Sequence, residues 1–456
     1  MASARGKCYN LPIMSEVRVR FAPSPTGKVH IGNIRAAIYN WLYARHVGGK
    51  FLLRVEDTDL ERSTPEAIQV LFECMKWLGL DYDEEVFYQT KNVKRHLEVV
   101  DELLAKGYAY KCEKTSRDGK TGTVVMFKMP KEGVIEYDDI VKGHMAKKAE
   151  DIQDFAIVRS DGSPIFHIAN VVDDIDQRVT HIIRGDDHVE NTFKHICIFK
   201  ALGAPVPQYA HLSMIVNQQG KPYSKRDGAA FVGEYREQGY LPEALFNYLL
   251  LLGWNPGDDR EVLDREEMIK LFELEKVHVT AAMFDPKKLA WMNGEYVKKI
   301  PQEKFKDEVR KAAATVGGDF QAPRDETWWD YLVAQIQPRT KFLTDLSKSI
   351  TCFFTDDFEF DPKAVEKRLK KEGVKATLLD LVARFGAVAD ADWQAPKLEE
   401  LVKGLSQGNG MGPWVHPIRV AVSGRGEGIG LFEMLQLLGK ERTLKRLQSA
   451  ADTLAL

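Results

Sequence analysis

The stretch VRVRFAPSPTGKVHIGN, Val17–Asn33, determines how the first part of the chain folds. Its first five residues alternate apolar and arginine side chains, and this period of two predicts a strand with one apolar face. Pro23 and Pro25 have no backbone N–H and a fixed φ, so strand pairing must end there in a rigid turn. Gly27 and Gly32 then allow the backbone to approach a ligand closely.

A helix is expected directly after this turn. Apolar residues recur at helical spacing from Ile34 to Leu42, and Gly48–Gly49 ends the run. His30 therefore stands where a strand leads into a helix N-terminus. Exposed N–H groups and the helix dipole favour a phosphate at such a point, and a neighbouring imidazole can donate a further hydrogen bond to it.

The next residues continue the alternation of strands and helices. Phe51–Val55 predicts a second strand, and a helix follows with Thr64 as its cap and Pro65 at its first position. This alternation is typical of a parallel sheet. Neither a dinucleotide-binding fingerprint nor a P-loop motif occurs in the sequence, so the commonest nucleotide-site motifs are absent.

Residues from about 88 to 164 look like an insertion of mixed type. Its expected elements are a helix, Val93–Lys106, and short strands around Tyr108–Tyr110 and Val124–Lys128. Sheet character is expected to return at Ile165–Val171 and Thr180–Arg184, before a helix at Val189–Leu202. From about Pro301 strand signals are few, and the helical candidates include Glu303–Ala314, Thr327–Ile336, Pro362–Lys371 and Leu431–Leu447.

Composition sets the broad class of the protein. At 456 residues the chain exceeds a single ordinary core, so two to four domains are expected. The formal net charge of −3 neither predicts nor excludes a polyanionic partner. Five scattered cysteines without a C-x-x-C pair argue for a reducing compartment and against a disulfide framework. No apolar run reaches membrane-spanning length, and residues 1–16 lack the apolar region of a signal peptide, so we expect a disordered leader, a cytoplasmic protein and no membrane.

Four blocks carry a resemblance to a known family. FAPSPTGKVHIGN resembles the HIGH signature of class I aminoacyl-tRNA synthetases, in the form carried by bacterial-type glutamyl-tRNA synthetases. RVEDTDLERS, Arg54–Ser63, looks like the next strand and loop of that family. FHIANVVDDIDQRVTHIIRGDDHVENT resembles its amino-acid and ATP-binding region, and GKPYSKRDGA resembles the KMSKR loop. The blocks also follow one another in the order of the family.

This resemblance implies the fold and the domain order. The fold class is α/β, with a Rossmann-type catalytic domain, an α+β insertion and an all-α C-terminal anticodon-binding region. The implied domains are the two catalytic halves (17–87 and 165–210), the acceptor-stem-binding insertion (88–164), the loop and stem-contact domain (211–300) and two helical subdomains (301–375 and 376–456).

The resemblance also implies the reaction and the nucleotide site. The family makes an aminoacyl-adenylate from ATP and transfers the acyl group to the terminal adenosine of a tRNA. His30, Lys225 and Arg226 are implied as catalytic residues, because the loop cations would engage the triphosphate as pyrophosphate leaves. The implied ATP contacts are His30, Gly32, Asn33, Asp187 and Lys225.

A second group of residues would hold the amino acid. The implied glutamate contacts are Arg20, Ala22, Ser24, Glu56, Phe166, Asn170 and Arg184. Arg184 would pair with the side-chain carboxylate in a bidentate manner that lysine reproduces poorly, and Glu56 would hold the ammonium group. Phe166 stands where a tyrosine is usual, so the pocket lacks one hydroxyl group.

Cofactors and partners follow from the same resemblance. ATP and Mg²⁺ are implied, together with tRNA-Glu, tRNA-Gln as a possible second RNA, and L-glutamate. Glutamate activation is expected to require bound tRNA, and the protein is expected to be a monomer. Some members hold zinc with a cysteine cluster in the insertion, but Cys112 stands alone there, so no protein-bound zinc is expected.

Two departures from the family pattern keep alternatives open. In the second signature loop, Pro222 stands where the first lysine is expected, and Tyr223 replaces the usual leucine or methionine. Pro222 and Phe166 together motivate one alternative, a catalytically weak tRNA-binding paralogue. A glutaminyl enzyme normally ends in β-barrel domains, and an enzyme that glutamylates a modified tRNA base lacks the last third of the chain, so both are disfavoured.

Overall fold

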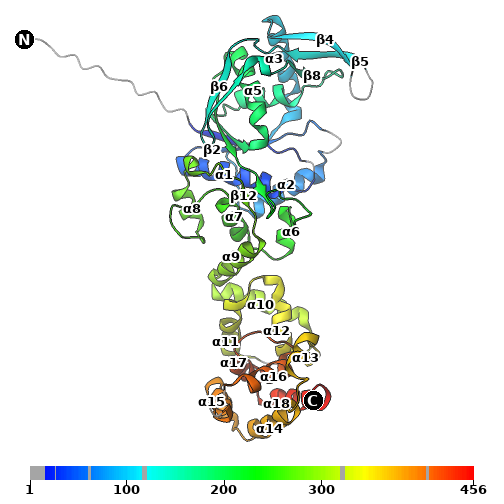
Figure 1. Ribbon diagram of the computed structural model, residues 1–456, viewed down its shortest axis with the longest axis vertical. Helices are drawn as coiled ribbons and strands as arrows, with labels where there is room; N and C mark the ends of the chain where they lie inside the picture. The colour runs from blue at the N-terminus through cyan, green and yellow to red at the C-terminus, as the bar shows by residue number, and fades with distance from the viewer. Residues whose placement is uncertain are drawn as a thin grey trace, which may run out of the picture. The chain divides into compact units, whose positions relative to one another are not determined.

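The computed structural model describes residues 16–25, 27–59, 63–115, 121–318, 324–406 and 410–455. The expected leader, residues 1–16, lies outside these ranges except for its last residue. The chain forms two compact units (Figure 1). Unit 1 runs to Glu237 and includes Pro242–Leu289, and unit 2 comprises Gln238–Leu241 and Ala290–Leu456. Among the described helices, none combines the length and the apolar composition that a membrane crossing requires.

Unit 1 is built on a parallel sheet. Its central strands are β1 (Arg18–Phe21), β2 (Lys50–Val55), β3 (Phe87–Tyr88), β9 (His181–Gly185) and β10 (Gln208–Leu212). β1 pairs with β2, β2 with β3, and β9 with β10, all in parallel. Thr180 precedes β9 and donates its N–H to the Arg18 carbonyl at 2.9 Å, which places β9 beside β1. The strands therefore read β3-β2-β1-β9-β10, the order of a doubly wound fold, and the expected α/β class is confirmed.

The first helices form where the sequence predicts them. Helix α1 (Ile31–Val47) begins after His30 and ends at Gly48, whose φ of 68° is the left-handed conformation that glycine adopts without strain. Helix α2 (Pro65–Trp77) is capped by the Thr64 side chain, which accepts a hydrogen bond from the Ala67 N–H. α1 is buried on most of its surface, because it packs on the sheet and under other helices of unit 1.

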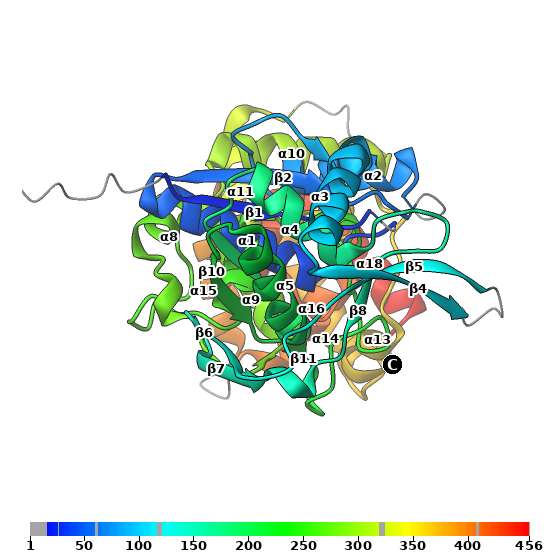
Figure 2. The ribbon, with the colours of Figure 1, turned by 90° about the horizontal axis from the view of Figure 1, so that it is seen from above.

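The insertion contains more strands than the sequence indicated. Helix α3 (Val93–Ala105), β4 (Ala109–Thr115) and β5 (Thr121–Phe127) match the expected elements, and β8 (Phe155–Val158) joins them in the antiparallel order β4-β5-β8. The hairpin of β6 (Val134–Asp139) and β7 (Gly143–Lys148) was not expected. β6 pairs in parallel with β10, at Tyr209 opposite Asp139, and so extends the central sheet (Figure 2).

One sheet prediction is wrong. Ile165–Val171 does not form a strand, because Phe166–Asp176 is helix α4, whereas helix α5 (Val189–Leu202) is confirmed. The apolar run has helical spacing, with Ile168 and Val172 both buried. Asp173 and Asp174 continue the buried part of the helix, which a strand assignment ending at Val171 missed.

The rest of unit 1 is short helices and one small sheet. The remaining elements are β11 (Ile215–Val216), α6 (Val232–Glu237), α7 (Pro242–Leu251), α8 (Arg265–Leu271), β12 (Ala282–Met283) and the start of α9 (Pro286–Lys299). β11 pairs in parallel with β12. Unit 1 therefore keeps the second signature loop, which follows β11, on the same body as the sheet.

Unit 2 is helical throughout its described residues. Its helices are α10 (Gln302–Val316), α11 (Glu326–Ile336), α12 (Leu346–Phe354), α13 (Pro362–Arg368), α14 (Val374–Gly386), α15 (Ala395–Ser406), α16 (Gly412–Ser423), α17 (Leu431–Leu438) and α18 (Lys440–Thr453). The expected helix Leu431–Leu447 is divided in two at Gly439, whose φ of 81° and ψ of 161° are open to glycine but not to a side-chain-bearing residue. One hydrophobic core, from Val297 to Ala451, joins these helices.

Candidate active site

A cavity of about 700 Å³ opens where the central strands end. Its walls include residues that directly follow β1, β2 and β10 and the last residues of β9. The strand order reverses between β1 and β9, and open α/β sheets bind ligands at such a point. The predicted site residues that line the cavity are Arg20, Ala22, Ser24, His30, Gly32, Asn33, Glu56, Phe166, Asn170, Arg184 and Asp187.

His30 is the N-cap of α1. Its Nδ1 accepts the Gly32 N–H at 3.1 Å, so the neutral ring carries its proton on Nε2. Burial lowers the pKa of His30, and a hydrogen bond to the Tyr223 backbone acts in the opposite direction. A Cβ at Gly32 would lie only 3.3 Å from His30 Nδ1, so glycine leaves room for this cap.

The free backbone donors expected at the start of α1 are not present. The Ile31 N–H donates to the Ala230 carbonyl at 3.0 Å, and the Asn33 N–H donates to the His30 carbonyl at 3.0 Å. The Gly32 N–H is bonded to the imidazole, so the N–H groups of Ile31, Gly32 and Asn33 all have hydrogen-bond acceptors within the protein. The expectation of exposed N–H groups was wrong because the cap and the neighbouring chain satisfy them, which sequence spacing does not reveal.

Lys225 and His30 contact the same aromatic ring, although Lys225 does not line the cavity. Its Nζ is 4.6 Å from the centre of the Phe231 ring, and the His30 ring meets that same ring edge-on at a centroid distance of 5.9 Å. Phe231 therefore places the loop cation and the helix-cap imidazole on one aromatic ring. Arg226 is exposed, and no cavity contact brings it to the other site residues.

The two departures in the signature loop have different surroundings. Pro222 lines the cavity and forms an isolated bridge with Val216. Tyr223 is 6% exposed, and its ring centroid lies 4.4 Å from that of Phe284. The tyrosine therefore occupies an apolar packing position, as the usual leucine or methionine would.

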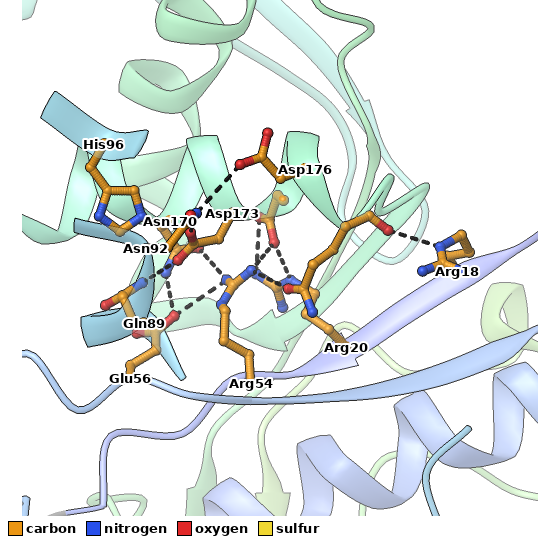
Figure 3. Close-up of polar contacts among 12 residues, drawn as sticks. Arg18, Arg20, Arg54, Glu56, Gln89, Asn92, His96, Asn170, Asp173 and Asp176 are labelled. Atoms are coloured by element: carbon orange, nitrogen blue, oxygen red, sulfur yellow. Dashed lines mark hydrogen bonds and ion pairs between the residues drawn. The ribbon is translucent and has the colours of Figure 1, made fainter. Parts of the chain in front are cut away.

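A buried ionic network forms the floor of the cavity beside Glu56 (Figure 3). Arg20 Nε and Arg54 Nη1 lie 3.0 and 2.7 Å from the same oxygen of Asp174. Arg54 Nη2 reaches Glu56 at 3.3 Å and Asn170 at 3.1 Å, and the Asn170 amide donates to Glu56 at 2.5 Å. Arg54 thus joins β2 to α4 and holds two cavity residues together, and Arg20 joins β1 to the same helix.

Burial and charge act in opposite directions in this network. Burial raises the pKa of Glu56, although Arg54 and Arg20 oppose that rise. For Asp174 the charges outweigh burial: burial alone would raise its pKa, but Arg20 and Arg54 lower the pKa below the usual value. Asp174 is therefore the ionised partner, whereas the charge of Glu56, which lines the cavity, depends on what the cavity holds.

A second buried group supports α4 from the side of the insertion. Asp173 accepts hydrogen bonds from the Gln89 amide at 2.8 Å, the Asn92 amide at 2.8 Å and His96 Nε2 at 2.6 Å. Figure 3 shows these side chains beside the Arg54 network. None of them was predicted, because a buried acid and its partners look like surface residues in a sequence.

Arg184 is the other buried cation of the cavity. It is 7% exposed and donates to Thr192 Oγ1 at 2.7 Å, to the His188 carbonyl at 3.3 Å and to His211 Nε2 at 3.3 Å. Burial lowers the pKa of Arg184 to about 10. No carboxylate of the described chain forms an ion pair with it. A buried guanidinium without a protein anion favours an anionic ligand in the cavity.

The remaining predicted contacts lie at the rim of the cavity. Phe166 stacks on His188 at a centroid distance of 5.7 Å, and Asp187 is exposed, with a carboxylate oxygen 3.5 Å from His188 Nε2. Lining residues outside the predicted set include Arg35, Asp186, His188, Asn191 and Met214. Arg35 offered one signal, since a charged residue interrupts the apolar stripe of α1; it is 2% exposed and donates to the Ser213 carbonyl at 2.7 Å.

No metal cluster is built by the described residues. They contain no group of three or more histidine, cysteine, aspartate or glutamate side chains that could hold an ion. Cys74, Cys112, Cys197 and Cys352 are each free thiols.

Comparison with known proteins places these features in a family. The catalytic-domain model of class I tRNA synthetases for glutamate and glutamine (E and Q) matches residues 16–121 and 113–291, and an anticodon-binding-domain model matches residues 267–451. A glutamate–tRNA ligase of Francisella philomiragia is 42% identical, with 96% of this chain and 99% of that protein covered. Glutamate–tRNA ligase 2 of Thermoanaerobacter pseudethanolicus is 39% identical, with coverage of 96% and 98%.

A solved structure agrees in fold over the same length. The glutamate tRNA ligase of Elizabethkingia meningosepticum, in complex with its amino acid, superposes with a TM-score of 0.83 at 29% identity, over 96% of this chain and all of that one. The doubly wound sheet, the signature segments around one cavity and the helical unit 2 therefore agree with both domain models. The chain belongs to the class I aminoacyl-tRNA synthetases, and within them to the glutamate–tRNA ligases.

Proposed function

We propose that this chain joins L-glutamate to the terminal adenosine of tRNA-Glu in two steps. First, an oxygen of the glutamate α-carboxylate attacks the α-phosphorus of ATP, the bond to the leaving oxygen breaks, and pyrophosphate departs from glutamyl-adenylate. Second, the ribose 2′-OH attacks the activated carbonyl and loses its proton, the bond from the acyl carbon to the phosphate oxygen breaks, and AMP leaves with the bonding electrons. Both steps depend on positioning and charge neutralisation more than on covalent catalysis by the protein.

One observation carries the choice of glutamate. Arg184 is buried at the cavity wall and has no carboxylate partner among the described residues, so it suits the side-chain carboxylate of the substrate. Glu56 would accept from the substrate ammonium, and that cation would stabilise its charged form. Arg20, Ala22, Ser24, Phe166 and Asn170 would complete the glutamate contacts.

The nucleotide would lie against the start of α1. We assign His30, Gly32, Asn33 and Asp187 to ATP, and Lys225 and Arg226 to the triphosphate. Mg²⁺ would be carried chiefly by the phosphates, because the described residues form no group of three or more histidine, cysteine, aspartate or glutamate side chains that could hold an ion. The Nε2–H of His30 would donate a hydrogen bond to the nucleotide in place of the Tyr223 backbone.

The finer assignments extend this proposal. Unit 2 would bind the anticodon through two helical subdomains, 301–375 and 376–456, and residues 88–164 would bind the acceptor stem. The remaining proposed domains are 17–87, 165–210 and 211–300. We further propose a cytoplasmic monomer whose glutamate activation requires bound tRNA, with tRNA-Gln as the candidate second acceptor RNA.

The direct test is esterification of radiolabelled glutamate, with glutamine in parallel, on purified tRNA-Glu and purified tRNA-Gln. Charging of tRNA-Glu alone, with glutamate alone, supports a discriminating ligase. Charging of both RNAs with glutamate supports the broader specificity. Charging with glutamine, or tRNA binding without any ester, would contradict the proposal.

A further inference from the structure

A chain of buried side chains leads from the insertion to Arg184. Asp139, the last residue of β6, places its Oδ2 2.5 Å from Nδ1 of His211 on β10. His211 Nε2 lies 3.3 Å from Arg184 Nε and 3.1 Å from Thr192 Oγ1. His211 and Thr192 have no exposed surface, Asp139 is 2% exposed, and none of the three lines the cavity.

The partners of His211, Asp139 on one side and Arg184 on the other, determine which ring nitrogen carries the proton. Asp139 is ionised, because burial is outweighed by hydrogen bonds from His211 and from backbone N–H groups, and its pKa is lowered. Asp139 can therefore only accept, so Nδ1 of His211 carries the hydrogen. A guanidinium has donors only, so the partner of Arg184 Nε must present a lone pair. The Nδ1–H tautomer meets both demands at once.

Donor counting shows which part of Arg184 remains for a ligand. A guanidinium has five N–H hydrogens. One on Nε is directed to His211, and the two on Nη2 are directed to Thr192 Oγ1 and the His188 carbonyl. The two hydrogens of Nη1 have no hydrogen-bond partner among the described residues. The three acceptors, His211 Nε2, Thr192 Oγ1 and the His188 carbonyl, thus orient the guanidinium so that Nη1 remains for a ligand.

We infer that His211 is a positioning residue for the substrate carboxylate: its Nε2 lone pair orients the Arg184 guanidinium, and Asp139 holds His211 in the tautomer that exposes this lone pair. The inference rests on the proposed role of Arg184 as the glutamate ligand. It also gives the insertion a part in amino-acid binding, because Asp139 belongs to β6. The carboxylate then binds end-on through Nη1, and not through the fork that the sequence analysis expected.

Two substitutions of similar size separate orientation from packing. His211→Gln can place its Oε1 near the position of Nε2 and accept from Arg184, but it gives up the contact with the Asp139 carboxylate. His211→Asn can donate to Asp139 from the position of Nδ1, but it does not reach Arg184. His181→Gln is the matched control, since His181 is also a buried histidine of the sheet, on β9. Its side chain contacts Tyr43 and Thr180, which are not site residues.

The measurement is steady-state charging of tRNA-Glu by the full chain, with KM for glutamate, KM for ATP and kcat determined separately. We expect His211→Asn to raise KM for glutamate about tenfold or more, the loss of one hydrogen bond to a charged group. His211→Gln should stay within about threefold of the wild-type KM, and KM for ATP and kcat should change little in either, as uniform binding requires. His181→Gln should leave all three constants unchanged.

Each other outcome has a definite meaning. Equal KM values for the Asn and Gln variants, or a parallel rise in KM for ATP, would overturn the positioning role of His211. Arg184→Lys shows whether a negative result concerns His211 alone or the proposed glutamate site as a whole. If Arg184→Lys raises KM for glutamate while the two His211 variants behave alike, only the inference falls. If Arg184→Lys leaves that KM unchanged, the proposed glutamate site falls, and the inference falls with it.

Discussion

Arg54 Nη1 lies 2.7 Å from Asp174 Oδ1, and the two side chains are 0% and 1% exposed. Removing two charges from water is costly, and the attraction between them repays that cost only when further hydrogen bonds satisfy both groups. Arg20 supplies such a bond to Asp174, and Glu56 and Asn170 supply them to Arg54. The pair therefore belongs to the scaffold that shapes the amino-acid end of the cavity.

Loss of Arg54 should destabilise unit 1 strongly. Arg54→Met leaves Asp174 buried with Arg20 as its remaining cation, and we expect the free energy of unfolding to fall by about 3–5 kcal/mol. Urea denaturation measures this change. Lys50→Met is the control, because Lys50 pairs with Glu84 at the surface at 3.0 Å, and its loss should cost less than about 1 kcal/mol. Equal losses in the two variants would show that the buried network contributes no more than a surface pair.

Lys225 should act on the rate of activation and not on glutamate affinity. Lys225→Ala removes a cation that would follow the charge developing on pyrophosphate, and we expect kcat for activation, measured with tRNA present, to fall about a hundredfold or more. KM for glutamate should change little, because the Nζ lies beside Phe231 and outside the cavity wall. Lys221→Ala tests the same loop at an exposed lysine, and little change is expected there. An equal effect of Lys225→Ala on kcat and on glutamate affinity would refute the assignment.

His167 should make unit 1 less stable in mild acid. Burial, with Lys194 and Arg184 nearby, lowers the pKa of His167 to about 4. Between the unfolded value near 6.5 and pH 4 the unfolded chain binds a proton that the folded chain does not, so stability falls as the pH falls through this window. In His167→Gln the loss of unfolding free energy between pH 7 and pH 5 should be smaller than in the wild type by about 1–2 kcal/mol. Urea denaturation at the two pH values tests this, and identical losses would contradict it.

Metal dependence should follow the nucleotide and not the cysteines. Excess EDTA is expected to abolish charging, and Mg²⁺ alone should restore it, because the ion would be carried by ATP phosphates. Cys112→Ser should charge tRNA-Glu at the wild-type rate, since Cys112 is a free thiol. A zinc requirement for recovery after EDTA, or zinc in the purified protein lost in Cys112→Ser, would refute the expected absence of a zinc site.

The parts of the fold that could be predicted are those with local signals. The turn after β1 has two prolines, α2 has a cap residue and a proline in its first turn, and predicted helices of unit 2 such as α10 and α11 have apolar residues at helical spacing. Phe166–Asp176 was misassigned because its apolar residues are mostly β-branched and favour a strand over a short window. The β6–β7 hairpin was missed because its charged residues hide the alternation of a strand.

The cavity residues could be predicted because they belong to the family signatures. The buried residues that hold them in place could not be predicted from the sequence. Arg54, Asp174 and His211 are charged or polar residues that the structure buries, whereas such residues are mostly exposed in proteins. Their partners are distant in the chain, 120 residues for Arg54 and Asp174 and 72 for His211 and Asp139. One signal existed, since Arg54 interrupts the apolar run of β2, a strand buried along almost its whole length.

The parallel pairing of β6 with β10 bears on how this chain can be recombined with a relative. A graft that replaces residues 88–164 with the insertion of a relative would exchange a strand of the catalytic sheet and, with it, the carboxylate that faces His211. Chimeras therefore need junctions that keep β6 and β7 with the recipient and exchange only the portion around β4, β5 and β8. In this chain the hairpin belongs to the sheet of the catalytic unit, although it lies within the segment 88–164.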